Sequence, residues 1–153
     1  MKKKNIVFVV SLLIDILSKV VIYSFLNDEV KLFKGFYFKL VYNTGCAFSF
    51  LENNNYLLIV IGIIMLYLIY RMSKDFDNSN LNNIAFGLLY GGIVGNLLNR
   101  IFFGYVIDFI KVVIYKYNFP IFNLADSFIV IGVGILLYDT FIKGEKDGSN
   151  SRK

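Results

Sequence analysis

Long apolar stretches, separated by short polar ones, dominate the pattern along the chain. Four of these stretches are long enough, or nearly long enough, to cross a bilayer as a helix, which takes about 20 residues. We expect four transmembrane helices at residues 6–26, 56–72, 84–103 and 121–142. The chain has 153 residues, so residues 1–153 are expected to form a single integral-membrane domain.

The first apolar stretch begins like a secretory signal peptide, because lysines at positions 2–4 precede it. However, no small-x-small cleavage site follows, and the apolar run continues past Asp15 and Lys19. We therefore interpret this stretch as a retained first helix.

The distribution of basic residues predicts the orientation of the helices. With both termini in the cytoplasm, nine Lys and Arg residues fall on the inner side and six on the outer side. The polar segment 143–153 would then be a cytoplasmic tail. The third and fourth helices would bring Arg100, Asp108 and Asp126 to the extracytoplasmic face. The first outer loop, which contains Asn43, would lie on that same face.

Two connections on the outer face have the composition of strands. Residues 32–42 and 106–117 are rich in aromatic and β-branched side chains and are too short or too charged to span a bilayer. Their Tyr and Phe content suits the headgroup region of a membrane. The predicted fold class is therefore an all-α membrane protein with four transmembrane helices and a small extracytoplasmic β element.

Composition narrows the possible chemistry. The chain is 57% hydrophobic with a mean hydropathy of +0.62, and its net charge of +5 is scattered rather than gathered in a basic stripe, so nucleic acid is not an expected partner. The chain has no histidine, and Cys46 is its single cysteine. This excludes Ser-His and Cys-His nucleophile systems and HExxH metal sites. An enzyme of this composition must use carboxylates, and we expect neither a metal nor another cofactor.

The third apolar stretch has a glycine every four residues, at Gly87, Gly91 and Gly95. One face of this helix lacks side chains, so a neighbouring helix can approach closely. Asn96 and Arg100 continue the same row toward the outer face. Helix packing alone explains the glycines, whereas Arg100 suits either a snorkelling side chain at a helix end or a functional site.

Two aspartates lie in apolar surroundings near the outer face. Asp126 follows Asn123 by three residues at the expected start of the fourth helix, which also suits a helix-capping role. Asp108 lies in a strand-like apolar run, where a solvated turn is the alternative explanation. Because both aspartates fall on one face beside Arg100 and Asn123, we interpret them as a functional pair.

Two facing carboxylates can share one proton, because like charges a few ångströms apart do not both ionise without cost. One carboxylate can then take a proton from an attacking water while its protonated partner donates to an amide carbonyl oxygen. This chemistry needs no metal and no covalent intermediate. Asp108 and Asp126 are therefore candidate catalytic residues for amide hydrolysis.

Five short motifs, in their order along the chain, carry a resemblance to a known family. They are DILSK (15–19), NTGCAFSF (43–50), GGIVGNLLNR (91–100), VIDF (106–109) and FNLADS (122–127). Together they resemble the bacterial lipoprotein signal peptidase, also called signal peptidase II, over nearly the whole chain. The resemblance implies an aspartic peptidase of the bacterial cytoplasmic membrane with its active site near the extracytoplasmic face. Its substrates would be diacylglyceryl-modified prolipoproteins, cut before the lipid-bearing cysteine.

Carried over position by position, the resemblance implies that Asp108 and Asp126 are catalytic. Four other matching positions would line the site and hold the substrate or the two aspartates, namely Asn43, Asn96, Arg100 and Asn123. Asp15 and Lys19 match as well, but at a spacing of four residues we interpret them first as an ion pair within the first helix. We expect the protein to work as a monomer in contact with membrane lipid.

Two positions depart from the pattern of the family. Asn99 stands where Asp is common, which would remove a possible partner of Arg100. Cys46 stands where Ala is common, and we interpret it as a small residue because no visible base would activate its thiol.

Two other classes of function share some of these features. A small transporter or proton channel would also keep Asp and Arg inside a helix bundle. An assembly or lipid-binding protein would use the glycine face and the aromatic outer loops. Neither class needs Asp108 and Asp126 paired outside a helix exit with Asn neighbours, so the peptidase hypothesis accounts for more of the sequence.

Overall fold

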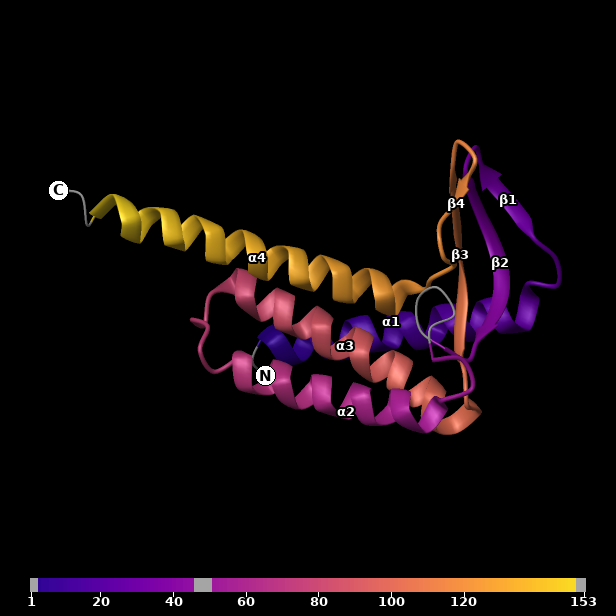
Figure 1. Ribbon diagram of the computed structural model, residues 1–153, viewed down its shortest axis with the longest axis horizontal. Helices are drawn as coiled ribbons and strands as arrows, with labels where there is room; N and C mark the ends of the chain where they lie inside the picture. Colours follow the sequence, from indigo (N-terminus) through magenta and orange to yellow (C-terminus); the bar gives the residue numbers. More distant parts are fainter. Residues whose placement is uncertain (1–2, 46–50, 151–153) are drawn as a thin grey trace.

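The computed structural model describes residues 3–45 and 51–150, with side chains of the last helix described as far as Phe141. Within these residues the chain forms four long helices, α1 (Lys3–Phe25), α2 (Asn55–Met72), α3 (Asn80–Phe103) and α4 (Leu124–Asn150). All four are long and apolar enough to cross a membrane. A small sheet lies across one end of the helices (Figure 1). The predicted four-helix fold with a β element is confirmed.

Helix α3 lies at the centre of the bundle because glycines remove its side chains where neighbouring helices cross. A Cβ atom on Gly87 would stand 2.6 Å from the Cβ of Val7 in α1, and one on Gly91 would overlap the Ser11 hydroxyl. On another face of α3, a Cβ on Gly92 would collide with the backbone of α4. The glycine row therefore packs against a neighbouring helix, as predicted.

Most of the buried apolar side chains form two clusters, and many of the other apolar side chains on the helices are exposed. The larger cluster lies between α2, α3 and α4 and contains Ile69, Ala85, Phe86, Leu89, Ile93 and Leu136. The second joins the end of α1 to the sheet through Ile22, Ile107 and Phe109. An exposed apolar periphery around a small core is the pattern expected for helices that face lipid.

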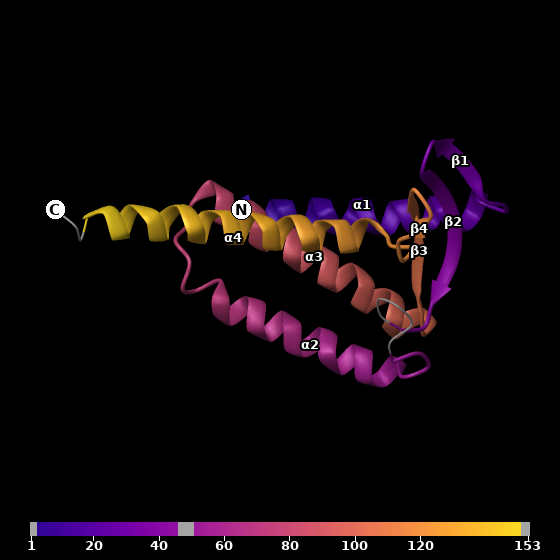
Figure 2. The same ribbon diagram turned by 45° about the horizontal axis from the view of Figure 1, so that its top comes forward.

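The sheet has four antiparallel strands in the order β1 (Val30–Phe33), β2 (Phe36–Asn43), β3 (Val106–Ile114) and β4 (Tyr117–Asn118). Its strands run across the helix axes near the end of α1 (Figure 2). The first four residues of β3 are buried, whereas the later ones become progressively exposed. The start of β3 is therefore anchored in the bundle, and its far end leaves it.

Several boundaries differ from the prediction. Helix α4 begins at Leu124 rather than 121, because Phe122 pairs with Ile110 of β3 before the helix starts. It ends at Asn150, so residues 143–150 continue the helix instead of forming an irregular tail.

Helix α3 begins at Asn80, four residues before its apolar stretch. The Ser79 hydroxyl accepts a hydrogen bond from the Asn82 backbone N–H (3.2 Å) and caps the helix there.

Each segment predicted as one strand contains a turn. In the segment 32–42 the turn falls at Gly35, whose φ of 86° suits a residue without a Cβ.

Candidate active site

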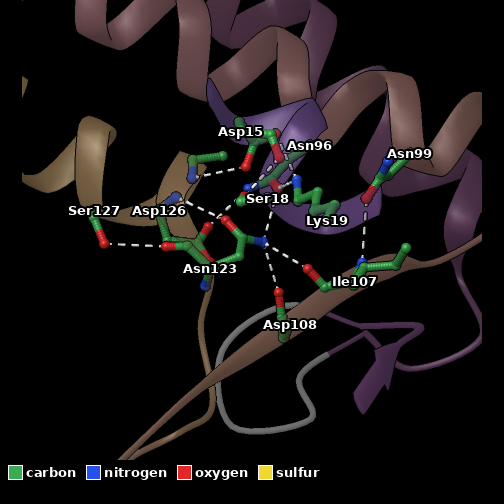
Figure 3. Close-up of polar contacts among 11 residues, drawn as sticks. Asp15, Ser18, Lys19, Asn96, Asn99, Ile107, Asp108, Asn123, Asp126 and Ser127 are labelled. Atoms are coloured by element: carbon green, nitrogen blue, oxygen red, sulfur yellow. Dashed lines mark hydrogen bonds and ion pairs between the residues drawn. The ribbon is translucent and has the colours of Figure 1, made fainter. Parts of the chain in front are cut away.

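Polar side chains from the sheet and the bundle meet where the start of β3 joins the helices. They are Asn43 at the end of β2, Asn96 and Arg100 on α3, Asp108 on β3, Asn123 just before α4, and Asp126 in the first turn of α4. All except Asn123 line a pocket of about 300 Å³, and the Asn123 side chain is hydrogen-bonded to both aspartates (Figure 3). The structure thus brings together every residue proposed for the core of the site.

The position of Asp126 is set by the cap of α4. Its backbone N–H donates to Asn123 Oδ1 (3.0 Å), and its Oδ2 accepts from the Asn123 backbone N–H (3.1 Å). This reciprocal pair is a capping box, so the capping role considered from the sequence is present. It occupies only one carboxylate oxygen, because Oδ1 accepts from Asn96 Nδ2 (2.7 Å). The cap holds a carboxylate at the wall of the pocket.

Asp108 is only 2% exposed, so the alternative of a solvated turn is wrong. Its Oδ1 accepts from Asn123 Nδ2 (2.6 Å), and its Oδ2 accepts from Asn43 Nδ2 (2.7 Å). The Ile110 backbone N–H donates to the Phe122 carbonyl oxygen (2.7 Å). This bond holds β3 beside the segment that leads into α4, and it places Asp108 on the same pocket as the helix cap.

Two amide side chains connect the carboxylates. Asn123 Nδ2 donates to Asp108 and also to Asn96 Oδ1 (3.0 Å). Asn96 Nδ2 in turn donates to Asp126. Each aspartate therefore accepts from an amide N–H, and the amides are bonded to each other. Such a connected network fixes the direction of both carboxylates before any ligand arrives.

Burial, and after it the nearby negative charge of Asp126, raise the pKa of Asp108 from an ordinary value of 3.8 to about 6. The N–H groups of Asn43 and Asn123 and the ammonium of Lys19 act in the opposite direction. Asp108 therefore binds a proton at a pH where an ordinary aspartate is ionised. This is the electrostatic condition for two carboxylates to hold one proton between them.

Asp15 and Lys19 of α1 are bonded to the network that holds the two aspartates. They form the predicted ion pair within α1, with Lys19 Nζ 2.7 Å from Asp15 Oδ2 and both side chains almost fully buried. The pair also reaches other helices, since Lys19 Nζ donates to Asn96 Oδ1 (2.9 Å) and Asp15 Oδ1 accepts from the Ala125 backbone N–H (3.0 Å). Gly95 leaves the space that the Asp15 carboxylate fills.

Arg100 lines the pocket and is held at two points. Its Nη2 donates to the Gly45 carbonyl oxygen (2.7 Å), and its own carbonyl oxygen accepts from Asn55 Nδ2 (3.0 Å). Arg100 thus connects the loop after β2 to the site, while Asn55 ties the start of α2 to the end of α3. Asn55 was not among the predicted site residues.

The two departures from the family pattern have different outcomes. Asn99 Oδ1 accepts from the Ile107 backbone N–H (3.2 Å), so its side chain is directed to β3 (Figure 3). The expectation that Asn at this position removes a possible partner of Arg100 stays a prediction. Cys46 and the rest of the motif up to Phe50 lie outside the described residues.

The described residues contain no cluster of three or more His, Cys, Asp or Glu side chains placed to hold a metal ion. The expectation that no cofactor is used stays a prediction.

Comparison with known proteins identifies the family to which this chain belongs. Residues 7–142 match the sequence model described as signal peptidase (SPase) II. The chain belongs to the signal peptidase II family. The resemblance carried by the five motifs is thus confirmed.

Individual relatives agree with this membership in signal peptidase II. The lipoprotein signal peptidase of Halalkalibacterium halodurans is 40% identical over 112 residues, which are 72% of this chain and 69% of that protein. A bacterial membrane enzyme solved at 2.3 Å has a TM-score of 0.82 at 30% identity, covering 96% of this chain and 90% of its own. A second, solved at 1.9 Å, has a TM-score of 0.79 at 29% identity, covering 90% and 91%. The chain is a multi-pass bacterial membrane protein and a hydrolase of the signal peptidase II family.

Proposed function

We propose that this membrane peptidase removes the signal peptide from diacylglyceryl-modified prolipoproteins, and that Asp108 and Asp126 carry out the hydrolysis. The observation that carries the proposal is the pairing of the two carboxylates on one pocket. They are joined by amide bridges, and the pKa of one is raised toward neutrality. Membership in the signal peptidase II family supports a hydrolase over a transporter or an assembly protein.

The two carboxylates supply both halves of an acid–base reaction. With one proton on the pair, the ionised carboxylate takes a proton from a water that attacks the amide carbonyl carbon. The protonated carboxylate donates to the carbonyl oxygen, and the resulting tetrahedral intermediate collapses as the amide nitrogen accepts a proton. The proton is assigned to the pair rather than to Asp108 or Asp126 alone.

The surrounding polar groups prepare this pair. Asn43, Asn96 and Asn123 direct N–H groups at the carboxylate oxygens, so the carboxylates keep their directions without a bound substrate. Arg100 lines the pocket, donates to the Gly45 carbonyl oxygen and supplies a positive charge to the pocket wall. We assign Arg100 to holding the substrate and the loop after β2.

A neighbouring apolar pocket supports a place for the signal peptide. This second pocket, of about 260 Å³, lies between α2, α3 and α4 and shares Asn96, Arg100 and Ile129 with the first. Its other lining residues are apolar and include Leu58, Ile61, Met65, Leu89, Ile93 and Val133. An apolar signal helix packed here would bring its last peptide bond to the carboxylates, while the diacyl chains stay in lipid.

We further propose that both termini are cytoplasmic, that the two aspartates lie near the extracytoplasmic face, and that the protein works as a monomer. The excess of basic residues on the side of the termini supports this orientation. The site sits at the end of the bundle where the sheet crosses, opposite the connection between α2 and α3 (Figure 1).

The direct test is cleavage of a diacylglyceryl-modified prolipoprotein by the purified protein in detergent. We expect a single cut before the lipid-bearing cysteine, identified by mass spectrometry, and little cleavage of the same precursor without its lipid. The matched control is the lipid-modified precursor incubated without the protein. Cleavage at another bond, or equal cleavage of the unmodified precursor, would contradict the proposed substrate class.

The pH dependence provides a second prediction. For the free enzyme we expect kcat/KM to fall as the pH rises through about 6, because the second carboxylate then loses the shared proton. Substrate that covers the pocket buries the pair further, so kcat should fall at a higher pH than kcat/KM.

Asn43→Ala tests whether the fall in kcat/KM with rising pH comes from the titration of Asp108. Removing the N–H that stabilises ionised Asp108 raises its pKa, so the fall in kcat/KM should move to higher pH. Initial rates across a pH series give both profiles. If the fall in kcat/KM occurred at the same pH in Asn43→Ala as in the wild type, a group other than Asp108 would be responsible for it.

A further inference from the structure

The two hairpin turns of the sheet lie side by side at the end farthest from the bundle. The Val113 backbone N–H donates to the Gly35 carbonyl oxygen (2.8 Å), and Phe36 pairs in register with Val112. Residues 33–36 and 114–119 together form what we call the sheet tip. It projects beyond α1 and α4 in the upper right of Figure 1.

The sheet tip is both aromatic and basic. Its exposed side chains are Phe33, Lys34, Phe36, Ile114, Tyr115, Lys116, Tyr117, Asn118 and Phe119. Tyr115 is 99% exposed, although its ring is large and apolar. A hollow of about 530 Å³ opens between the two turns, with Lys34, Tyr37 and Tyr115 in its lining.

The positive charge of the sheet tip is not compensated by acidic residues in the part of the sheet that leads to the tip. Segments 30–43 and 109–122 contain no Asp or Glu. Nearer the bundle, Lys111 pairs with Glu29 (2.8 Å). Among the described residues, by contrast, no carboxylate lies within 4.0 Å of the ammonium of Lys34 or Lys116.

The position of the sheet determines what its tip meets. Ile22 near the end of α1 packs against Ile107 and Phe109, so the sheet lies at the level where α1 ends. In a protein whose helices span the bilayer, that level corresponds to the headgroup region. Because the sheet tip overhangs the bundle, it faces lipid at this depth rather than protein (Figures 1 and 2).

We propose that the sheet tip binds the headgroups of anionic phospholipids. Lys34 and Lys116 bind the negatively charged headgroups, and the aromatic side chains of both turns enter the interface beside them. Lysine near an anionic surface favours charged lipid by about fivefold per residue. Strand β3 carries Asp108 at the pocket and leads to the sheet tip at its other end. Lipid bound at the tip therefore stabilises the strand that positions Asp108. This binding does not depend on the proposed proteolysis.

The absence of tryptophan from the chain allows a clean fluorescence test. Tyr115→Trp places a single emitter at the sheet tip of the full-length protein, reconstituted in nanodiscs of phosphatidylglycerol or of phosphatidylcholine whose scaffold protein contains no tryptophan. The control reporter, Asp75→Trp, occupies an exposed position in the connection between α2 and α3 at the other end of the bundle. Acrylamide, which stays in water, is the quencher.

We expect acrylamide to quench the Tyr115→Trp reporter several-fold less in phosphatidylglycerol than in phosphatidylcholine. Adding Lys34→Gln and Lys116→Gln should remove most of that difference, and high salt should weaken it. Lys74→Gln, which removes a charge from the opposite end, should leave it unchanged. Melting temperatures of all variants confirm that they are folded.

Two results would overturn the proposal. Quenching of the Tyr115→Trp reporter as strong as that of the Asp75→Trp reporter in phosphatidylglycerol would show that the sheet tip lies in water. Equal protection in both lipids, unchanged by the lysine substitutions, would show an apolar interfacial contact without recognition of anionic headgroups. The fluorescence measurements do not depend on cleavage activity. A failure of the proposed peptidase function would therefore be detected separately, in the cleavage assay.

Discussion

Replacing either Asp108 or Asp126 by Asn should lower the rate of prolipoprotein cleavage by on the order of 10³-fold, because the one remaining carboxyl group cannot act as base and acid at the same time. Asn has the shape of Asp but neither accepts nor gives up a proton near neutral pH. Because two groups that act as one unit are not additive, the double substitution should be little worse than either single one. Initial rates with lipid-modified substrate, at matched amounts of folded protein, measure the effect.

The control for these substitutions is Asp139→Asn. Asp139 is also buried and also lies on α4, but it contacts Asn82 far from the pocket. We expect its replacement to leave the cleavage rate within about twofold at matched folded yield. A substitution distant from the site that shares no contacts with it acts independently of the site. A fully active Asp108→Asn or Asp126→Asn enzyme would refute the two-carboxylate mechanism, whatever the family of the chain.

Much of the fold could be predicted because the bilayer imposes a simple rule on the sequence. A helix that crosses lipid satisfies its backbone hydrogen bonds internally, so a long apolar run has one stable outcome. The glycines of α3 and the aromatic outer segments were equally direct signals. The boundaries were harder, since the start of α4 depends on the bridge between Phe122 and Ile110, which hydropathy does not reveal.

In the candidate site, too, the residues could be found from their sequence surroundings, whereas contacts between distant segments could not. Asp108 and Asp126 were found because a carboxylate in apolar surroundings is costly and therefore noticeable. The contacts of Asn55 with the Arg100 carbonyl and of Asp15 with the Ala125 N–H join elements far apart in sequence. A single polar residue at a helix start, or an i,i+4 pair, gives no sign of such a partner, so these roles required the structure.

Replacing Lys19 by Met should cost about 3–5 kcal/mol in the free energy of unfolding, because it leaves the Asp15 carboxylate buried without its counter-ion. It should also lower cleavage by roughly tenfold, since the Asn96 oxygen loses a charged donor worth about 1.5 kcal/mol or more. Asn96 then holds Asp126 less firmly. Unfolding in mixed micelles and initial rates at equal folded concentration separate the two losses.

The double variant Asp15→Asn with Lys19→Met distinguishes a structural role from an electrostatic one. The Asn side chain can still accept from the Ala125 N–H, and no unpaired buried charge remains, so most of the lost stability should return. The Lys19 ammonium lowers the pKa of Asp108, so without it the fall in kcat/KM should move to higher pH. If activity and the pH profile both recovered together with stability, Lys19 would serve only to hold the helices. A shifted profile in a stable double variant would instead show that α1, which contributes no side chain to the pocket itself, lowers the pKa of Asp108 through one buried charge.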